Sequence, residues 1–193
     1  MSRGQDPQRP PREKPSPPPP RKRESLVIVN TGDGKGKSTA AFGVVLRAVA
    51  REWPVSVIQF VKSDRWQVGE EEVARGLGVE WAKTGDGFSW LSDDLERSQA
   101  LAAAAWELAE ETLAAGRHRL VVLDEITYPM NWGWIPTEAV AEAIRGRPAH
   151  VNVIATGRDA PAPLLEIADT VTEMVKVRHA YDAGVRAMRG LDF

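Results

Sequence analysis

The residues at positions 30–39, "NTGDGKGKST", have the types and spacing that bind phosphate groups. They follow the apolar run "SLVIV" and contain Gly36, Lys37 and Ser38, which match the end of the phosphate-loop pattern G-x-x-x-x-G-K-[ST]. The first glycine of that pattern falls on position 31, which is threonine, and the glycine stands one place later at Gly32. In such loops, backbone N–H groups and a helix N-terminus face the phosphates. The alternative is a glycine turn before a solvated helix.

A pair of carboxylates follows a second apolar run, in "RLVVLDEITY" at positions 119–128. Asp124 and Glu125 thereby fall at the carboxyl end of a buried strand, where open α/β sheets bind ligands. Mg²⁺ takes oxygen ligands, so either carboxylate would complete a shell to which Ser38 gives its hydroxyl. Lys37 would neutralise phosphate charge. Unless the acids are only a surface pair, the two motifs predict a nucleotide with Mg²⁺ but no particular reaction.

Two other segments contain polar side chains whose role the pattern leaves open. "TGRDAP" at 156–161 ends an expected strand with Arg158, which is either a phosphate or ribose contact or a solvent-facing arginine. "VRHAYDAG" at 177–184 contains His179, and a lone histidine is more often structural than functional.

Aromatic residues stand in two expected loops. "TGDGFSW" at 84–90 places Phe88 and Trp90 beside glycines, where anchoring of a loop to the core is the commoner reason for such residues. "YPMNWGWI" at 128–135 adds Trp132 and Trp134 next to the acidic motif, as a lid on the core or as a ligand wall.

The elements that must position these residues alternate regularly from residue 25 onward. Expected strands cover 25–30, 55–61, 78–82, 119–125, 150–156 and 169–177, and expected helices cover 37–52, 69–76, 93–115, 136–145 and 161–168. Continuous apolar strands that alternate with helices indicate a parallel sheet covered on both faces. The expected fold is a three-layer α/β domain, P-loop NTPase-like (RecA-like), with a mostly parallel sheet.

Composition narrows the class of protein. The 193 residues fit one ordinary domain, and a net charge of -2 argues against a protein that coats nucleic acid. The lack of cysteine excludes disulfides and thiol nucleophiles and suits the cytoplasm, while no apolar stretch approaches the ~20 residues of a membrane helix. Residues 1–24, rich in proline and arginine, are expected to be a disordered tail before a domain at 25–193. A transit peptide or a contact to an anionic ligand is the alternative for the tail.

Several motifs in chain order resemble one enzyme family. They are "TGDGKGKSTAAFG", "VIQFVK", "GEEE", "TGDGFSW", "VVLDEITY", "ATGR", "IADTVTEM" and "RHAYDAGVRAMRGLDF". Together they resemble the P-loop ATP:corrinoid adenosyltransferases, from about residue 25 to the end of the sequence. That family writes its loop T-G-N-G-K-G-K-[ST]-T, so Thr31 in place of the first glycine is a mark of the family.

The resemblance implies a reaction. Such enzymes transfer the 5′-deoxyadenosyl group of ATP to the Co(I) centre of cob(I)yrinic acid a,c-diamide or cob(I)alamin, and tripolyphosphate leaves. Co(I) is itself the nucleophile, so the protein must supply orientation and stabilise charge on the departing triphosphate. The resemblance further implies a homodimer. An external reductase is expected because the chain has no cysteine and no flavin motif, and the composition predicts a cytoplasmic protein with neither nucleic acid nor membrane as a partner.

It also implies roles for individual residues. Phe88 and Trp90 match an aromatic pair implicated in displacing the lower ligand of cobalt, and with Lys37 and His179 they form the expected catalytic set. The expected Mg²⁺ ligands are Ser38, Glu125 and Asp124. The expected nucleotide-binding residues are Thr31, Gly32, Asp33, Gly34, Lys35, Gly36, Lys37, Ser38, Thr39 and Arg158.

The departures from the family pattern are small. Asp33 stands where asparagine is common, Ser38 replaces threonine but keeps the hydroxyl, and Trp132 and Trp134 leave the shape of one wall open. Two alternatives stand beside the transferase: a conventional P-loop ATPase or kinase, and a nucleotide-binding regulatory or nucleic-acid module.

Overall fold

The computed structural model of the protein describes residues 23–61, 69–84 and 95–192. Its strands form one six-stranded sheet in the order β3-β2-β4-β5-β1-β6, and each neighbouring pair is parallel. The predicted parallel sheet is therefore confirmed. The strands are β1 (Val27–Thr31), β2 (Val55–Phe60), β3 (Glu80–Thr84), β4 (Leu120–Asp124), β5 (Asn152–Thr156) and β6 (Thr170–Glu173).

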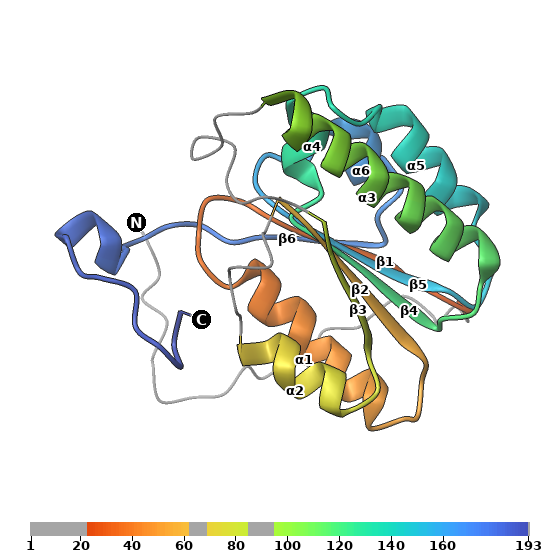
Figure 1. Cartoon of the computed structure of the whole chain (residues 1–193), viewed down its shortest axis with the longest axis horizontal. Helices are drawn as coiled ribbons and strands as arrows, with labels where there is room; N and C mark the ends of the chain where they lie inside the picture. The colour runs from red at the N-terminus through yellow and green to blue at the C-terminus, as the bar shows by residue number, and fades with distance from the viewer. Residues whose placement is uncertain (1–22, 62–68, 85–94, 193) are drawn as a thin grey trace, which may run out of the picture.

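Helices cover both faces of the sheet (Figure 1). One face carries α1 (Lys37–Val49) and α2 (Gly69–Gly76). The other carries α3 (Leu95–Ala115), α4 (Thr127–Asn131), α5 (Thr137–Gly146) and α6 (Ala162–Glu166), and a 3-10 helix, η2 (Ala180–Ala183), follows β6. This is the predicted three-layer α/β arrangement, of the P-loop NTPase-like type.

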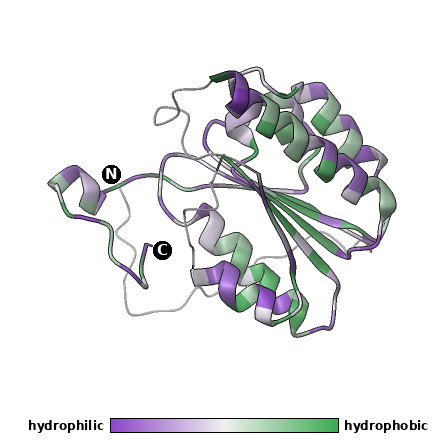
Figure 2. Cartoon of the chain, viewed as in Figure 1, coloured by the Kyte–Doolittle hydropathy of each residue, from purple (hydrophilic) through white to green (hydrophobic). Residues whose placement is uncertain are grey.

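An apolar cluster lies on each side of the sheet. Phe42 and Val45 of α1 pack with Val57 on one side, and Trp106 of α3 packs with Leu123 on the other. Every residue of β2 and β4 is buried, because helices cover both faces of these strands. Figure 2 shows the result: the central strands are mostly hydrophobic, while the helices alternate between hydrophobic and hydrophilic stripes.

The predicted boundaries differ from the structure mainly at the edge of the sheet. The strand expected at 169–177 is longer than β6, an edge strand of four exposed residues that ends at Glu173. The helix expected at 161–168 is the short α6, and the one expected at 37–52 ends at Val49. Helices α4 and η2 were not predicted, since four or five residues carry too little periodicity to indicate a helix.

The topology brings three separate segments to one edge of the sheet. β5 lies between β1 and β4, and the register pairs Asn30 with Thr156 and Leu123 with Ala155. The carboxyl ends of the three strands therefore line up. As a result, the loop after β1, the turn after β5 and the acidic pair at the end of β4 are neighbours.

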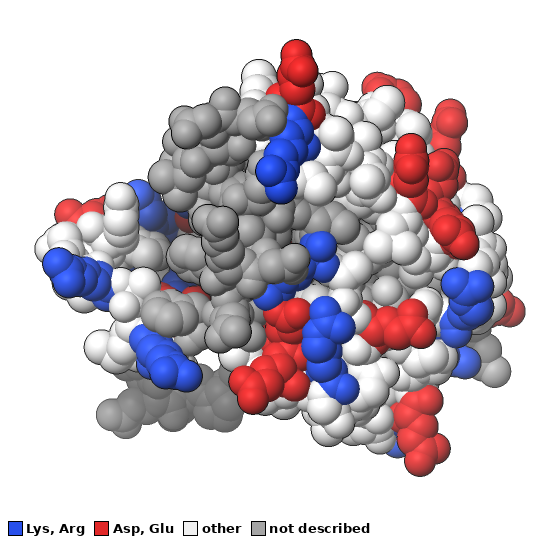
Figure 3. Space-filling view, viewed as in Figure 1, with Lys and Arg blue, Asp and Glu red and all other residues white. Residues whose placement is uncertain are grey.

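Charged side chains are interspersed on the surface. On the described part of the face in Figure 3, Lys and Arg alternate with Asp and Glu instead of forming one continuous basic field. This distribution fits the net charge of -2. Within residues 23–61, 69–84 and 95–192, no helix has the length and apolar character needed to cross a membrane.

Candidate nucleotide-binding site

The loop after β1 is held in a compact shape by Lys37 and by the chain that follows β6. Lys37 Nζ donates hydrogen bonds to the carbonyl oxygens of Gly32 and Gly34, at 2.7 Å each. The Gly34 N–H donates to the Met174 carbonyl at 2.6 Å, and a Cβ atom on Gly34 would lie 2.6 Å from that same oxygen. Gly36 has φ 114°, a left-handed conformation that favours glycine, directly before α1 begins. The glycines of the motif therefore serve this loop's close approach to Met174 and its entry into a helix.

The acidic pair has two different environments. Asp124 is fully buried, and its carboxylate accepts hydrogen bonds from Thr156 Oγ1 at 2.7 Å and from Gln59 Nε2 at 2.9 Å. Glu125 is partly exposed and has φ 63°, a left-handed conformation that is uncommon for a residue with a side chain. Its N–H donates to Thr156 Oγ1 at 2.9 Å. Asp124 is therefore wholly enclosed, while Glu125 is partly exposed as a residue but keeps its Oε2 atom buried.

Electrostatics connect the loop to the acidic pair. Burial lowers the pKa of Lys37, and the carboxylates of Glu125, Asp33 and Asp124 oppose this shift while Arg158 adds to it. The five predicted site residues are therefore close enough to influence one charge. Among the three carboxylates, Glu125 has the largest effect.

Tyr128, which the sequence analysis did not single out as a site residue, belongs to the same neighbourhood. Burial raises its pKa to about 12, and the Glu125 carboxylate adds to the shift because it disfavours a second negative charge. The Tyr128 ring packs at a tilt against Trp132, with ring centroids 5.5 Å apart, and the Trp132 and Trp134 ring centroids are 4.6 Å apart. Tyr128 and Trp132 also pack against the core, so this aromatic stretch covers the core beside the acidic motif.

Arg158 is presented by a tight turn after β5. Its Nε atom lies 3.8 Å from Asp33 Oδ1, and its carbonyl oxygen accepts a hydrogen bond from Thr127 Oγ1 at 2.6 Å. The preceding Gly157 has φ 140°, and a Cβ atom there would overlap the Thr127 hydroxyl. The turn therefore requires glycine, and it places Arg158 beside Asp33 of the loop, while its contact to phosphate or ribose stays a prediction.

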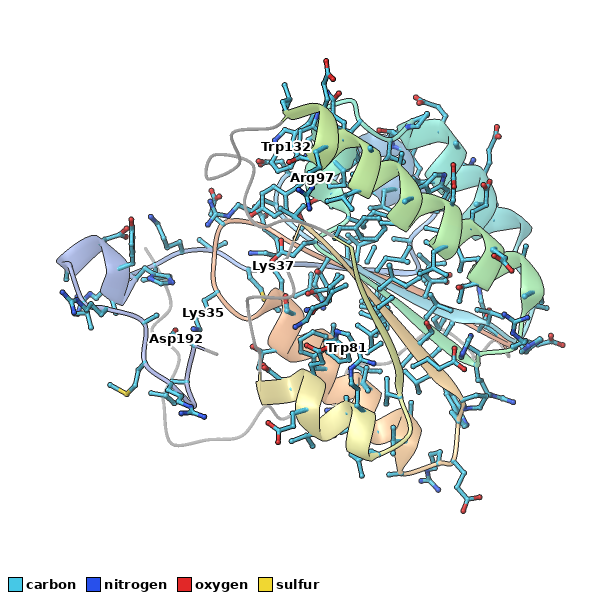
Figure 4. The ribbon with its side chains drawn as sticks, viewed as in Figure 1. Lys35, Lys37, Trp81, Arg97, Trp132 and Asp192 are labelled. Carbon is cyan, nitrogen blue, oxygen red and sulfur yellow. The ribbon has the colours of Figure 1, made fainter. Side chains whose placement is uncertain are left out.

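Lys35, the other loop lysine, points to the opposite side of the loop from Lys37 (Figure 4). Its Nζ forms an ion pair with Asp192 near the end of the chain. Gly190 and Leu191 then line an apolar cavity of about 470 Å³, together with Thr39 and Phe42 of α1. The C-terminal residues thus contact the phosphate loop and the helix that follows it.

The structure does not bring every predicted residue to this place. His179 is exposed, caps η2 and accepts a hydrogen bond through Nδ1 from the Tyr181 N–H at 3.1 Å. Figure 1 shows η2 outside the sheet and its covering helices. Phe88 and Trp90 lie outside the described residues.

Residues that the sequence analysis missed lie behind the acidic pair. Gln59 and Thr156 are fully buried and bond Asp124, and Trp81 Nε1 donates to Gln59 Oε1 at 3.0 Å. A signal was available for two of them. Gln59 interrupts the apolar run "VSVIQFV", and Thr156 ends the apolar run "VNVIAT", where a polar side chain needs a partner if the strand is buried.

The oxygen ligands available at the carboxyl ends of the strands fit a hard cation such as Mg²⁺. Ser38, with its hydroxyl, is the second residue of α1, Asp124 is the last residue of β4 and Glu125 follows it. Hydroxyl and carboxylate oxygens are the ligands that Mg²⁺ prefers. Among the described residues no group of three or more His, Cys, Asp and Glu side chains could hold a metal alone. A Mg²⁺ ion here would thus depend on phosphate oxygens as well, which is its usual manner of binding beside a nucleotide.

Comparison with known proteins identifies the family of the chain. The sequence model of the family described as "ATP:corrinoid adenosyltransferase BtuR/CobO/CobP" matches residues 23–193. The corrinoid adenosyltransferase CobA of Salmonella typhimurium is 42% identical over 168 residues, which are 87% of this chain and 85% of the relative. A corrinoid adenosyltransferase of Escherichia coli shows the same identity and coverage, and one of Pseudomonas aeruginosa is 41% identical over 170 residues, 87% of this chain and 83% of the relative.

The match extends over the whole described part of the chain. The chain therefore belongs to the ATP:corrinoid adenosyltransferase family and is an enzyme of ATP-dependent adenosyl transfer to corrinoids.

Proposed function

We propose that the residues gathered at the carboxyl ends of β1, β4 and β5 hold the triphosphate of ATP while its 5′ carbon is attacked by Co(I). The observation that carries this proposal is that the phosphate loop, Asp124–Glu125 and Arg158 meet at the carboxyl ends of three neighbouring strands, with Arg158 Nε 3.8 Å from Asp33 Oδ1. The cobalt(I) electron pair forms the cobalt–carbon bond, the C5′–O bond breaks, and its electrons leave on tripolyphosphate. The alternatives of an ordinary ATPase or a regulatory module are not favoured by the family.

The cationic groups have separate tasks in this proposal. Lys37 and Arg158 would bind oxygens of the leaving triphosphate, where positive charge stabilises the transition state more than the ground state. Lys35 would contribute a third cation, for which it must exchange Asp192 for a phosphate oxygen. The backbone N–H groups of Gly36, Ser38 and Thr39 at the start of α1 would bind the same phosphates.

Mg²⁺ would be held by the Ser38 hydroxyl and the acidic pair. The partly exposed Glu125 is the stronger candidate for a contact on the site side, and the buried Asp124 would act from behind it. The ion would supply charge neutralisation on the triphosphate. The residues present fit this role, because all are oxygen donors at one edge of the sheet.

On the strength of the family resemblance, Phe88 and Trp90 are proposed to act on the corrinoid, and His179 on the corrinoid or the nucleotide. Replacing Phe88 and Trp90 with alanine should weaken turnover when Co(II) must be reduced in the assay, with much less loss when Co(I) is supplied chemically. Equal loss in both assays would contradict a role in displacing the lower ligand.

We further propose a cytoplasmic homodimer that receives electrons from a separate reductase. The absence of cysteine and of a flavin motif supports an external electron source. Exposed apolar side chains on and after the edge strand β6, among them Val171, Val175 and Val177, support a covered surface in an oligomer. Sedimentation equilibrium tests this, and a monomer at all concentrations would contradict it.

The reaction itself is tested with the purified chain under anaerobic conditions. Mg-ATP and chemically reduced Co(I) corrinoid should give an adenosylcorrinoid absorbance spectrum with tripolyphosphate as the phosphate product. Comparison of cob(I)alamin with cob(I)yrinic acid a,c-diamide ranks the two substrates. Release of orthophosphate without a spectral change would instead support an ATPase.

A further inference from the structure

A chain of hydrogen bonds between buried side chains crosses the sheet behind the acidic motif. It starts at Trp81 on β3, passes through Gln59 on β2 to Asp124 on β4, continues to Thr156 on β5, and ends at the backbone of Glu125. Gln59, Asp124 and Thr156 have no exposed surface, and Trp81 is 6% exposed. The four successive donor–acceptor distances are 3.0, 2.9, 2.7 and 2.9 Å. The chain thus spans the neighbouring strands β3, β2, β4 and β5 at buried positions.

The direction of each hydrogen bond follows from the chemistry of its ends. An indole N–H can only donate, so Trp81 fixes the Gln59 amide with its oxygen toward the indole and its NH₂ toward Asp124. A backbone N–H can also only donate, so the Thr156 hydroxyl oxygen accepts from Glu125 and its proton is donated to the other Asp124 oxygen. Both oxygens of the Asp124 carboxylate therefore receive a donor, and its plane is fixed.

The same chain supports the unusual backbone at Glu125. A residue with a side chain at φ 63° is strained, and such a conformation persists only where surrounding contacts hold it. The bond from the Glu125 N–H to Thr156 Oγ1 is such a contact. It determines the direction in which the Glu125 side chain leaves the strand.

The other end of the chain reaches the helix of the phosphate loop. The Trp81 ring packs on Phe42, with ring centroids 5.1 Å apart. Phe42 lies four residues after Ser38 on α1, which places the two residues on the same side of the helix. The chain therefore joins β4, which carries the acidic motif, to the helix that carries the serine.

We propose that Trp81, Gln59 and Thr156 are positioning residues for the cation site, which they serve by holding Asp124 and Glu125 in register with Ser38. The inference rests on the proposed binding of Mg²⁺ by Ser38, Asp124 and Glu125. Replacing a residue that hydrogen-bonds to a metal ligand typically lowers metal affinity or activity about 10–100-fold. The same range is expected for Thr156, and a smaller effect for Trp81, which is two bonds from the carboxylate.

The test compares ATP affinity with and without Mg²⁺ by calorimetry on the full chain. The quantity of interest is the gain in affinity that Mg²⁺ brings. T156V should reduce this gain about tenfold or more, while T156S, which keeps the hydroxyl, should restore it. W81F, which keeps a ring but loses the indole N–H, should give a partial loss. T112V and W106F are matched controls, because Thr112 and Trp106 are also buried but lie on α3, outside the chain of hydrogen bonds.

A second readout needs no metal. In the presence of EDTA, the Glu125 amide should exchange its proton slowly in the unsubstituted chain and in T156S, and faster in T156V. An E125Q variant separates the two levels of the proposal. If E125Q reduces the Mg²⁺ gain and T156V does not, the positioning role is wrong while the cation site stands. If E125Q has no effect, the cation site is wrong and the positioning role falls with it.

Discussion

Lys37 shows how one residue serves the shape and the charge of the loop together. Its Nζ atom bonds two loop carbonyls at 2.7 Å, and its side chain is largely buried. Burial penalises the ammonium form and lowers the pKa of Lys37 below its ordinary 10.5. Between the lowered pKa and 10.5, the unfolded chain binds more protons at this residue than the folded chain does, so the contribution of Lys37 to stability rises with pH there.

The lowered pKa of Lys37 predicts a proton linkage in ATP binding. A bound triphosphate favours the charged lysine and raises its pKa again, so ATP binding at alkaline pH should be accompanied by proton uptake. Calorimetry in buffers of different ionisation heat measures this uptake. Lys37→Arg is the control, because arginine stays protonated and should show no uptake at this site. Equal uptake by both proteins would contradict the assignment to Lys37.

For Tyr128, the contribution to the free energy of unfolding is expected to fall with rising pH, opposite to that of Lys37. Its pKa is raised from 10.0 to about 12, so the folded chain keeps a proton that the unfolded chain loses. The stabilising contribution is complete below pH 10 and is lost as pH rises from 10 toward 12. Tyr128→Phe should therefore flatten the decline in the free energy of unfolding with pH, measured by urea titration on both sides of pH 10. Glu125→Gln should flatten it in part. A Tyr128→Phe variant with an unchanged slope would contradict the prediction.

At the scale of elements, the turn after β5 has the strictest backbone requirement described. Gly157→Ala would place a methyl group into the Thr127 hydroxyl at φ 140°, and should lower the free energy of unfolding by about 2 kcal/mol or more. The same change at Gly43, within α1 and with no atom within 4 Å of an added Cβ, should stabilise the helix by about 0.5–1 kcal/mol. Urea unfolding of both variants tests the contrast. If Gly157→Ala did not lower the free energy of unfolding relative to Gly43→Ala, the steric requirement at the turn would be contradicted.

Elements were also the scale at which the sequence predicted most. The apolar runs and their alternation with helices indicated the parallel sheet, and the two motifs indicated the strand ends at which the site is proposed. What could not be predicted depends on contacts between distant segments. The bond from Gly34 to Met174 and the bond from Gln59 to Asp124 join different strands or loops, and no local pattern specifies such pairs. The helix at η2 depends on a local cap by His179, a residue whose pattern suggested other roles.

For the whole molecule, the boundary of the folded domain can be tested by truncation. Arg23 pairs with Asp169 at 2.7 Å, and Ser25 accepts a hydrogen bond from Arg147. Removal of residues 1–22 should leave the free energy of unfolding within about 0.5 kcal/mol of the full chain, because the expected tail lacks apolar groups to bury. Removal of residues 1–26 should destabilise it clearly, since these contacts are lost. A large effect of the shorter truncation would contradict a disordered tail.

The strand order also has a consequence for the making of the protein. β1 is the first strand of the domain to be synthesised, yet it pairs with β5 and β6, the last two. During synthesis, β1 therefore lacks both of its neighbouring strands until β5 and β6 have left the ribosome. Contacts of such long sequence separation form slowly and leave strand edges open to association with other chains. The phosphate loop, which is fixed by Met174 just beyond β6, is for the same reason among the last parts of the enzyme to assemble.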